Sequence, residues 1–376
     1  MLPELWSRDR RDRVCVARLP AAETNMRGIF VVNHFRAIAT AMTCAFALTG
    51  VAEAQSMRLI TQNQEQRAQY PAEADAVAAL TEAGFDVSRS EYQAVGIDLA
   101  DGLRLLSTGA FNMATIQVGS VAKDDPFLEG VDLIGVSTNM EDLKSAVDAF
   151  RDVFNARLEE KFGVTAAAIW PFGPQVFLCG AEISSLDDLD GMKVRSFTAS
   201  MSTLLENLGA TPVTLSFPEV YPALQRGVAT CGVTSPTSSN TGKWPEVTTH
   251  LYPLSVSGSV QAHMVNLEWL NGLSEEDRAA FDEAMAAMEA ELWDVAINTN
   301  DTAQSCSTGG DCPEGGIYTS YDMTLVPVSD ADKARVAEIS VSAVLPEWAE
   351  KCEASYPGCK QIWNDTVGAA RGLSID

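Results

Sequence analysis

The sequence predicts an α/β protein with two lobes and a cleft between them. Segments with the apolar pattern of strands alternate with segments of helical spacing, an order typical of βαβ units. This alternation occurs both before and after Trp170–Pro174, and no low-complexity linker divides the two stretches. Because no flexible tether separates them, we expect the lobes to pack around a cleft, where small-molecule sites often lie.

The first stretch begins with Met57–Thr61 (MRLIT), an apolar run that predicts a buried strand. Apolar residues at helical spacing predict a helix over Ala72–Ala83, which Gly84 is suited to end. Alternating apolar residues predict a strand over Phe85–Gln93. Four further elements are predicted: a helix over 99–107, a strand over 111–118, a helix over 140–162 and a strand over 164–170.

The second stretch repeats the alternation with shorter elements. Strands are predicted over 176–178, 192–196, 213–217 and 227–233, and helices over 200–208 and 219–225. Ser274 and Asp277 then have the spacing of a capping box and open the longest predicted helix. Its apolar face repeats from Phe281 to Val295, so we expect this helix to run across both lobes.

The N-terminal residues have the pattern of an export signal. Arg27 and Arg36 flank a positive stretch, 16 uncharged residues follow over 37–52, and Ala52-Glu53-Ala54 has small residues where a signal peptidase cleaves. The alternative is a membrane anchor, but a spanning helix needs about 20 apolar residues. We therefore expect a signal peptide over 26–54, cleaved near Ala54, and export to the periplasm. Residues 1–25 are interpreted as an upstream extension from a misplaced start.

The cysteine count fits an exported protein. Cys15 and Cys44 lie in the segment expected to be removed, and six cysteines remain. An even number in an exported chain predicts disulfides, and six cysteines allow 15 pairings. Proximity along the chain favours two short loops, and the remaining two cysteines form the third pair. The predicted disulfides are Cys306–Cys312, Cys352–Cys359 and Cys179–Cys231.

Charge and motifs exclude several classes of function. The formal net charge of −25 argues against nucleic acid and anionic membrane surfaces as partners. The part after residue 54 has two histidines, His250 and His263, and lacks the H-E-x-x-H, G-x-S-x-G and P-loop patterns. Asp188-x-Asp190-Gly191 resembles part of a calcium loop, but its first and twelfth positions are Leu186 and Phe197. We expect no catalytic residue, metal or cofactor.

Four motifs carry a resemblance to a known family. They are LDGMKVR at 189–195, LGATP at 208–212, EVYPALQRGV at 219–228 and WLNGLSEED at 269–277. Together they resemble the solute-binding component of tripartite ATP-independent periplasmic (TRAP) transporters. The family is typified by receptors for four-carbon dicarboxylates and sialic acid.

The resemblance implies a two-lobed periplasmic-binding-protein (flytrap) fold with a long hinge-spanning helix. We accordingly expect lobe I over 56–172 plus 260–299 and lobe II over 173–259 plus 300–376. The implied function is a receptor, and not an enzyme, that captures a small organic acid as its carboxylate. It delivers this ligand to the membrane subunits of a TRAP permease, and we expect a monomer.

The resemblance also assigns ligand-binding residues. Arg195 stands where the family's arginine forms a salt bridge to the ligand carboxylate, and Phe217 where a residue packs on the ligand. Without the resemblance, Arg195 would be interpreted as a solvated partner of Asp187 or Asp188. Thr234 replaces a ligand-binding Asn found in several members, and Thr230 replaces a common Asp. Gln175 stands about where sialic-acid binders have another Arg, which argues against sialic acid.

Three further residues complete the candidate site. Gln64 and Gln117 follow strands at places where the family's first lobe offers polar groups, although either is equally explained as a solvated loop residue. Trp170, near Phe172, lies at the crossover between lobes, where it lines a pocket or packs the hinge. One guanidinium among aromatic residues favours a monocarboxylate with an apolar or aromatic body. The alternatives are a periplasmic enzyme on the same scaffold and a receptor for a sensor or an ATP-driven importer.

Overall fold

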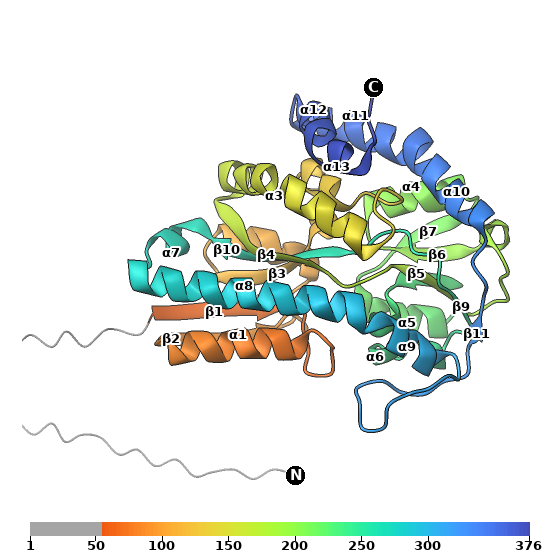
Figure 1. Ribbon diagram of the computed structural model, residues 1–376, viewed down its shortest axis with the longest axis horizontal. Helices are drawn as coiled ribbons and strands as arrows, with labels where there is room; N and C mark the ends of the chain where they lie inside the picture. The colour runs from red at the N-terminus through yellow and green to blue at the C-terminus, as the bar shows by residue number, and fades with distance from the viewer. Residues whose placement is uncertain (1–54) are drawn as a thin grey trace, which may run out of the picture. The chain divides into compact units, whose positions relative to one another are not determined.

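A computed structural model of this chain describes residues 55–376. The predicted extension over 1–25, the predicted signal peptide over 26–54, and Cys15 and Cys44 lie outside these residues. Within residues 55–376, no helix is both long enough and apolar enough to cross a membrane. The described residues form two β-sheets with helices packed on them, so the predicted α/β class is confirmed (Figure 1). We call the five-stranded sheet with its helices the first lobe, and the six-stranded sheet with its helices the second lobe.

The first lobe is built on a five-stranded sheet with the order β2-β1-β3-β10-β4. Strand β1 is parallel to both β2 and β3, as alternating strands and helices predict. Strand β10 is instead antiparallel to β3 and β4, because it returns from the second lobe and not through a βαβ crossover. The strands are β1 (Gln55–Thr61), β2 (Phe85–Glu91), β3 (Met113–Gln117), β4 (Val164–Pro171) and β10 (Val260–Asn266).

The helices of the first lobe have clear end signals. Asn139 caps helix α3 by accepting a hydrogen bond from the Asp142 N–H, and Gly163 ends α3 with φ of 64°. Ser274 caps α8 at the Asp277 N–H, as the capping box predicts. The helices are α1 (Tyr70–Glu82), η1 (Leu99–Asp101), α2 (Gly102–Ser107), η2 (Val118–Val121), η3 (Pro126–Asp132), α3 (Met140–Phe162), α7 (Leu267–Asn271) and α8 (Glu275–Asn298).

The second lobe is built on a six-stranded sheet with the order β11-β9-β5-β8-β6-β7. Its strands are β5 (Val176–Cys179), β6 (Lys193–Ser196), β7 (Thr211–Thr214), β8 (Cys231–Thr234), β9 (His250–Tyr252) and β11 (Thr324–Leu325). Its helices include η4 (Leu186–Leu189), α4 (Ala199–Asn207), α5 (Phe217–Gln225), α6 (Pro236–Thr241), η5 (Trp244–Glu246), α9 (Asn300–Ser307) and α10 (Asp330–Ile339).

Two predicted strands in the second lobe have wrong boundaries. The strand predicted over 227–233 is β8, which begins only at Cys231, and the other error concerns Phe217. The strand predicted over 213–217 ends at Thr214, and Phe217 is the first residue of α5. The reason is a capping box in which Ser216 and Glu219 satisfy each other's backbone N–H groups. Phe217 is therefore presented from a helix N-terminus at the end of the sheet.

Three of the connections between the lobes lie in the part of the chain from β4 to α9. Two of them, the segments after β4 and before β10, pair with each other: Phe172 N donates to Ser259 O at 3.2 Å and Gln175 N to Ser257 O at 2.8 Å. The third is formed by α8, which packs on α1 and β4, and by α9, which follows it and packs on α6 (Figure 1). The predicted long helix is α8, and the chain that leaves it continues as α9 into the second lobe.

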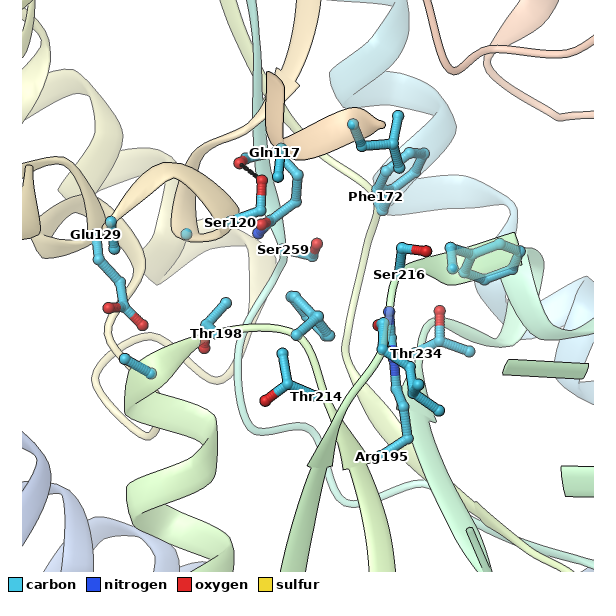
Figure 2. Close-up of a pocket in the computed structure, with 18 of the residues that line it drawn as sticks. Gln117, Ser120, Glu129, Phe172, Arg195, Thr198, Thr214, Ser216, Thr234 and Ser259 are labelled. Atoms are coloured by element: carbon cyan, nitrogen blue, oxygen red, sulfur yellow. Dashed lines mark hydrogen bonds between the residues drawn. The ribbon is translucent and has the colours of Figure 1, made fainter. Parts of the chain in front are cut away.

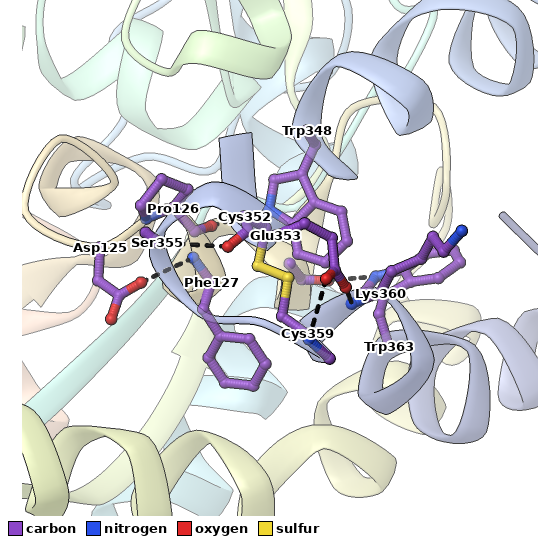
Figure 3. Close-up of a disulfide and its surroundings, with 12 residues drawn as sticks. Asp125, Pro126, Phe127, Trp348, Cys352, Glu353, Ser355, Cys359, Lys360 and Trp363 are labelled. Carbon is purple, nitrogen blue, oxygen red and sulfur yellow. Dashed lines mark hydrogen bonds between the residues drawn. A yellow bond between two sulfur atoms is a disulfide. The ribbon is translucent and has the colours of Figure 1, made fainter. Parts of the chain in front are cut away.

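Residues 55–376 contain three disulfides, and they join the pairs that we predicted. One disulfide links opposite residues of the neighbouring strands β5 and β8, so it fixes the middle of the second sheet. Another closes the loop after α9, and the third joins α11 (Leu345–Ser355) to α12 (Cys359–Trp363) (Figure 3). The pairs are Cys179–Cys231, Cys306–Cys312 and Cys352–Cys359.

The last helices pack on the first lobe. The indole N–H of Trp348 in α11 donates to Pro126 O at 2.8 Å, and that of Trp363 in α12 donates to Gly130 O at 2.8 Å (Figure 3). Both acceptors lie on η3, next to α3. The predicted lobe boundaries remain a prediction. Residues 345–376, which we assigned to lobe II, nevertheless contact elements of the first lobe.

Candidate ligand-binding site

A cavity of about 690 Å³ lies between the two lobes. In Figure 2, Gln117 and Ser120 approach it from the first lobe and Arg195, Thr214 and Thr234 from the second. Residues of the crossing segments also line it. The side chains that matter for ligand chemistry are Gln64, Arg67, Gln117, Phe172, Gln175, Arg195, Phe197, Phe217, Thr234 and Ser259.

Arg195 is the central cation of this cavity. It lies on β6, is 3% exposed, and points between the neighbouring strands. Its Nε donates to Leu215 O at 3.0 Å and its Nη1 to Val233 O at 2.8 Å. These two bonds fix the guanidinium in one orientation, which leaves its remaining donors for a ligand. The predicted placement of Arg195 at the site agrees with this geometry.

The guanidinium of Arg195 forms no direct ion pair in the part of the chain that the structure describes, although the charge of Glu219 acts on it. No carboxylate there lies within 4.0 Å of it, and burial lowers its pKa. The alternative partners are already occupied, since Asp187 pairs with Arg335 and Asp188 accepts the Ser184 and Ser185 N–H groups. A desolvated guanidinium fork of this kind is suited to bind a carboxylate.

Phe217 also lines the cavity, at the start of α5. Its ring stacks on Trp244 with ring centroids 5.3 Å apart and an interplanar angle of 20°. Phe217 therefore supplies an apolar wall near Arg195, whose guanidinium carbon lies 5.9 Å from the Trp244 ring centroid.

A second guanidinium at the cavity was missed by the sequence analysis. Arg67, in the loop between β1 and α1, lines the cavity, and its guanidinium carbon lies 4.1 Å from the Phe217 ring centroid. Burial lowers its pKa as well. The only signal in the sequence was its place just after the first strand, the same signal that indicated Gln64. The expectation of a single guanidinium is therefore wrong.

Two polar residues near the second sheet, Thr234 and Gln175, also line the cavity. Thr234 is the last residue of β8 and is 4% exposed, and Gln175 is 2% exposed; both line the cavity. Gln175 is held by its own turn, since its Nε2 donates to Gly173 O at 2.9 Å. Thr230 lies before β8 and is not part of the cavity wall.

The polar residues of the first lobe line the cavity as well. Gln64 is held by Gln93, to whose Oε1 its Nε2 donates at 3.0 Å. Gln117 ends β3, and its Oε1 is buried without a hydrogen-bond partner among residues 55–376. A buried acceptor without a partner is costly unless a ligand or water satisfies it. Gln117 is thus placed to accept a hydrogen bond from a ligand donor.

Trp170 does not line the cavity, so the prediction that it contacts the ligand is wrong. Its side chain is fully buried, and its indole N–H donates to His263 Nδ1 at 3.0 Å. A buried tryptophan needs such a partner for its N–H, and here the partner lies inside the first lobe. Phe172, whose ring centroid is 5.1 Å from that of Trp170, lines the cavity instead (Figure 2).

Comparison with known sequences places the chain among solute receptors. The profile of bacterial extracellular solute-binding protein, family 7 (DctP), matches residues 98–310. The chain is 27% identical over 201 residues to the C4-dicarboxylate-binding periplasmic protein DctP of Rhodobacter capsulatus, covering 52% of this chain and 60% of that protein. It is 29% identical over 164 residues to the ectoine-binding periplasmic protein TeaA of Halomonas elongata, covering 43% and 46%. The matches span about half the length of these curated relatives.

Solved structures share the fold. An extracytoplasmic solute receptor of Bordetella pertussis that binds pyroglutamic acid superposes with a TM-score of 0.72 at 17% identity, covering 83% of this chain and 100% of that one. A TRAP periplasmic solute-binding protein of Rhodoferax ferrireducens with bound malonate gives 0.72 at 16% identity, covering 84% and 98%. These likenesses confirm the two-lobed periplasmic-binding-protein fold.

Proposed function

The chain belongs to family 7 of the bacterial extracellular solute-binding proteins, and from this premise we propose that it captures a small organic acid and delivers it to a TRAP-type membrane permease. The observation that carries the proposal is Arg195. A buried guanidinium without a carboxylate partner in the described residues, at the wall of a cavity between two lobes, requires an anion to complete it. A ligand carboxylate supplies that anion.

The body of the acid is proposed to be apolar or aromatic. Phe172, Phe197 and Phe217 line the cavity and make part of its wall apolar. The proteins of similar fold from Bordetella pertussis and Rhodoferax ferrireducens bind pyroglutamic acid and malonate, which are small carboxylic acids. The expectation of one carboxylate rested on Arg195 as the single guanidinium. Since Arg67 lines the same cavity, that premise no longer supports a monocarboxylate.

We propose that the chain works as an exported monomer, with its signal peptide cleaved near Ala54. An enzyme on the same scaffold has less support, because His250 and His263, the histidines of the described residues, do not line the cavity. The mass of the protein purified from the periplasm tests the cleavage site. Turnover of a bound acid by the purified protein would favour the enzyme.

The first test identifies the ligand. Mass spectrometry of the small molecules retained by freshly purified mature protein is expected to find a carboxylic acid. Calorimetry then compares succinate and malate with aromatic and branched acids. Tight binding of succinate or malate, with none for the aromatic and branched acids, would contradict the apolar or aromatic body.

The second test addresses the site. The Arg195→Ala variant is expected to fold and to lose affinity for the acid by about 30- to several-thousandfold, the loss typical of a truncated buried charge pair. Calorimetry measures the affinity and circular dichroism the fold. Unchanged affinity would overturn the assignment of Arg195.

A further inference from the structure

We propose that Arg67 is a second ligand-binding residue, which donates from the first lobe to a second anionic group of the acid and so selects diacids over their monoacid analogues. This inference rests on the proposed function and concerns the same cavity. It assigns to the ligand a chemical feature, a second negative group, that Arg195 alone does not require.

The loop that carries Arg67 is held in place before any ligand enters. The Arg67 N–H donates to Gln64 O at 2.8 Å, and the Tyr70 N–H donates to Arg67 O at 3.1 Å at the start of α1. The side chain of Gln64 is tied to Gln93 and also accepts a hydrogen bond from Gln66 Nε2 at 2.9 Å. A residue supported in this way loses little additional freedom on binding.

The guanidinium of Arg67 reaches across the cavity. It comes from the first lobe, yet it lies over the ring of Phe217 in the second lobe, 4.1 Å from the centroid. A guanidinium stacked on an aromatic face keeps its N–H donors in the plane of the group, directed away from the ring. The stacking therefore orients Arg67 and leaves its donors for an acceptor in the cavity.

The lack of a carboxylate partner distinguishes Arg67 from most other arginines. Among residues 55–376, six other arginines that are at least partly shielded from solvent have a carboxylate within 4.0 Å, and only Arg67 and Arg195 have none. Both of these exceptions line the cavity. The paired arginines are Arg89, Arg151, Arg157, Arg278, Arg335 and Arg371.

The acidic residues of the first lobe that line the cavity are already engaged. Glu91 pairs with Arg89 at 3.4 Å and Asp98 accepts the Ala100 N–H at 2.9 Å. Glu129 accepts the Ser200 N–H at 2.9 Å, and Glu347 on α11 pairs with Lys351 at 2.6 Å. A monoacid bound at Arg195 would leave the partly buried guanidinium of Arg67 without an anion, which is unfavourable. A diacid neutralises both guanidinium groups and contacts both lobes at once.

Calorimetry with matched pairs of acids tests the inference. The probes are malonate and acetate, succinate and butyrate, glutarate and valerate, and phthalate and benzoate, in which the second carboxylate is absent from one member. In the wild-type protein, the diacid of at least one pair is expected to bind more tightly than its monoacid. Arg67→Gln is expected to lower diacid affinity by about thirtyfold or more and to leave monoacid affinity within about twofold.

Two further variants serve as controls. Arg67→Lys keeps the charge and is expected to retain part of the diacid preference, while Arg278→Gln removes a positive charge from the surface of α8 and is expected to change neither affinity. Circular dichroism verifies folding, and the Lys variant carries the test if the Gln variant does not fold. A diacid preference that survives in Arg67→Gln, or a wild-type protein that binds both members of every pair equally, overturns the inference. Binding of no acid by the wild-type protein overturns the proposed function and the inference together.

Discussion

Buried charge is treated in opposite ways in the core of the first lobe and in the cavity. In the core, the fully buried carboxylate of Glu73 accepts hydrogen bonds from Thr61 Oγ1 at 2.6 Å and from Arg89 Nε at 2.8 Å. In the cavity, Arg195 is 3% exposed, and its hydrogen-bond partners among the described residues are two backbone carbonyls. Both regions contain desolvated charge, but only the core neutralises it internally.

The core arrangement extends through a histidine to the hinge. Trp170 donates to His263 Nδ1, so that Nδ1 is the acceptor and Nε2 is the protonated nitrogen that donates to Glu73 Oε2 at 3.1 Å. We call Thr61, Glu73, Arg89, Trp170 and His263 the core network. Every charge in it has a partner, which is the arrangement expected of a structural site. In the cavity, Arg195 has no carboxylate within 4.0 Å among the described residues. Such an unpaired charge is expected in a site where the ligand supplies the opposite charge.

The largest effect is expected from breaking the core network at its centre. Glu73→Ala removes one of the two carboxylates that pair with Arg89 and leaves several buried donors without an acceptor, which should lower the free energy of unfolding by about 3–5 kcal/mol. Urea denaturation followed by circular dichroism measures this loss. The affinity of the folded protein for its acid should change little. A decrease of less than about 1 kcal/mol would show that the network contributes less to stability than its geometry indicates.

The opposite result is expected when the same kind of change is made in the cavity. Arg195→Ala should change the free energy of unfolding of the ligand-free protein by less than about 2 kcal/mol, because lost hydrogen bonds are offset by removal of an unpaired buried charge. Urea denaturation in the absence of acid provides the measurement. Addition of the acid should stabilise the wild-type protein and not the variant. A loss as large as that of Glu73→Ala would show that Arg195 is mainly structural.

The two regions also differ in how far the sequence predicts them. Arg195 was assigned by motifs close to it in the sequence, LDGMKVR among them, and these remain neighbours in the folded second lobe. The core network joins residues far apart in the chain, since Glu73 and His263 are 190 residues from each other. Apolar periodicity predicts elements but not such pairings, which depend on the order of strands in the sheet.

Two errors at the site have related causes. Trp170 was predicted to contact the ligand because aromatic residues mark the crossover, yet its orientation depends on β10 lying beside β4 in the sheet and presenting His263. Arg67 was missed because a loop residue has no periodicity that reports its direction. Its importance becomes visible only when Phe217, from the other lobe, is found beneath its guanidinium.

Separate substitutions of Trp170 and Phe172 sharpen the boundary between core and cavity. Trp170→Phe removes the hydrogen bond to His263 and should lower the free energy of unfolding by about 1–3 kcal/mol. It should leave the affinity for the acid within about twofold, because Trp170 does not line the cavity. The matched variant Phe172→Leu should weaken binding more than it affects folding. If Trp170→Phe weakens binding as much as Phe172→Leu does, the correction of Trp170 is itself wrong.

The smallest effect concerns pH and the charge of Glu73. Burial raises the pKa of Glu73, but hydrogen bonds from His263, Thr61 and Arg89 outweigh this, so the pKa is lowered in the folded protein from 4.5. A carboxylate with a lowered folded pKa contributes stability that is fully present above the unfolded pKa and is lost as pH falls through the folded pKa. The difference in unfolding free energy between wild type and Glu73→Gln should therefore be constant near neutral pH and shrink on acidification below 4.5.

The effect is smaller than that of Glu73→Ala because a neutral Glu73 keeps its shape and part of its hydrogen bonding. Urea denaturation at a series of pH values checks this, and a difference that grows as pH falls would mean that Glu73 is protonated in the folded protein.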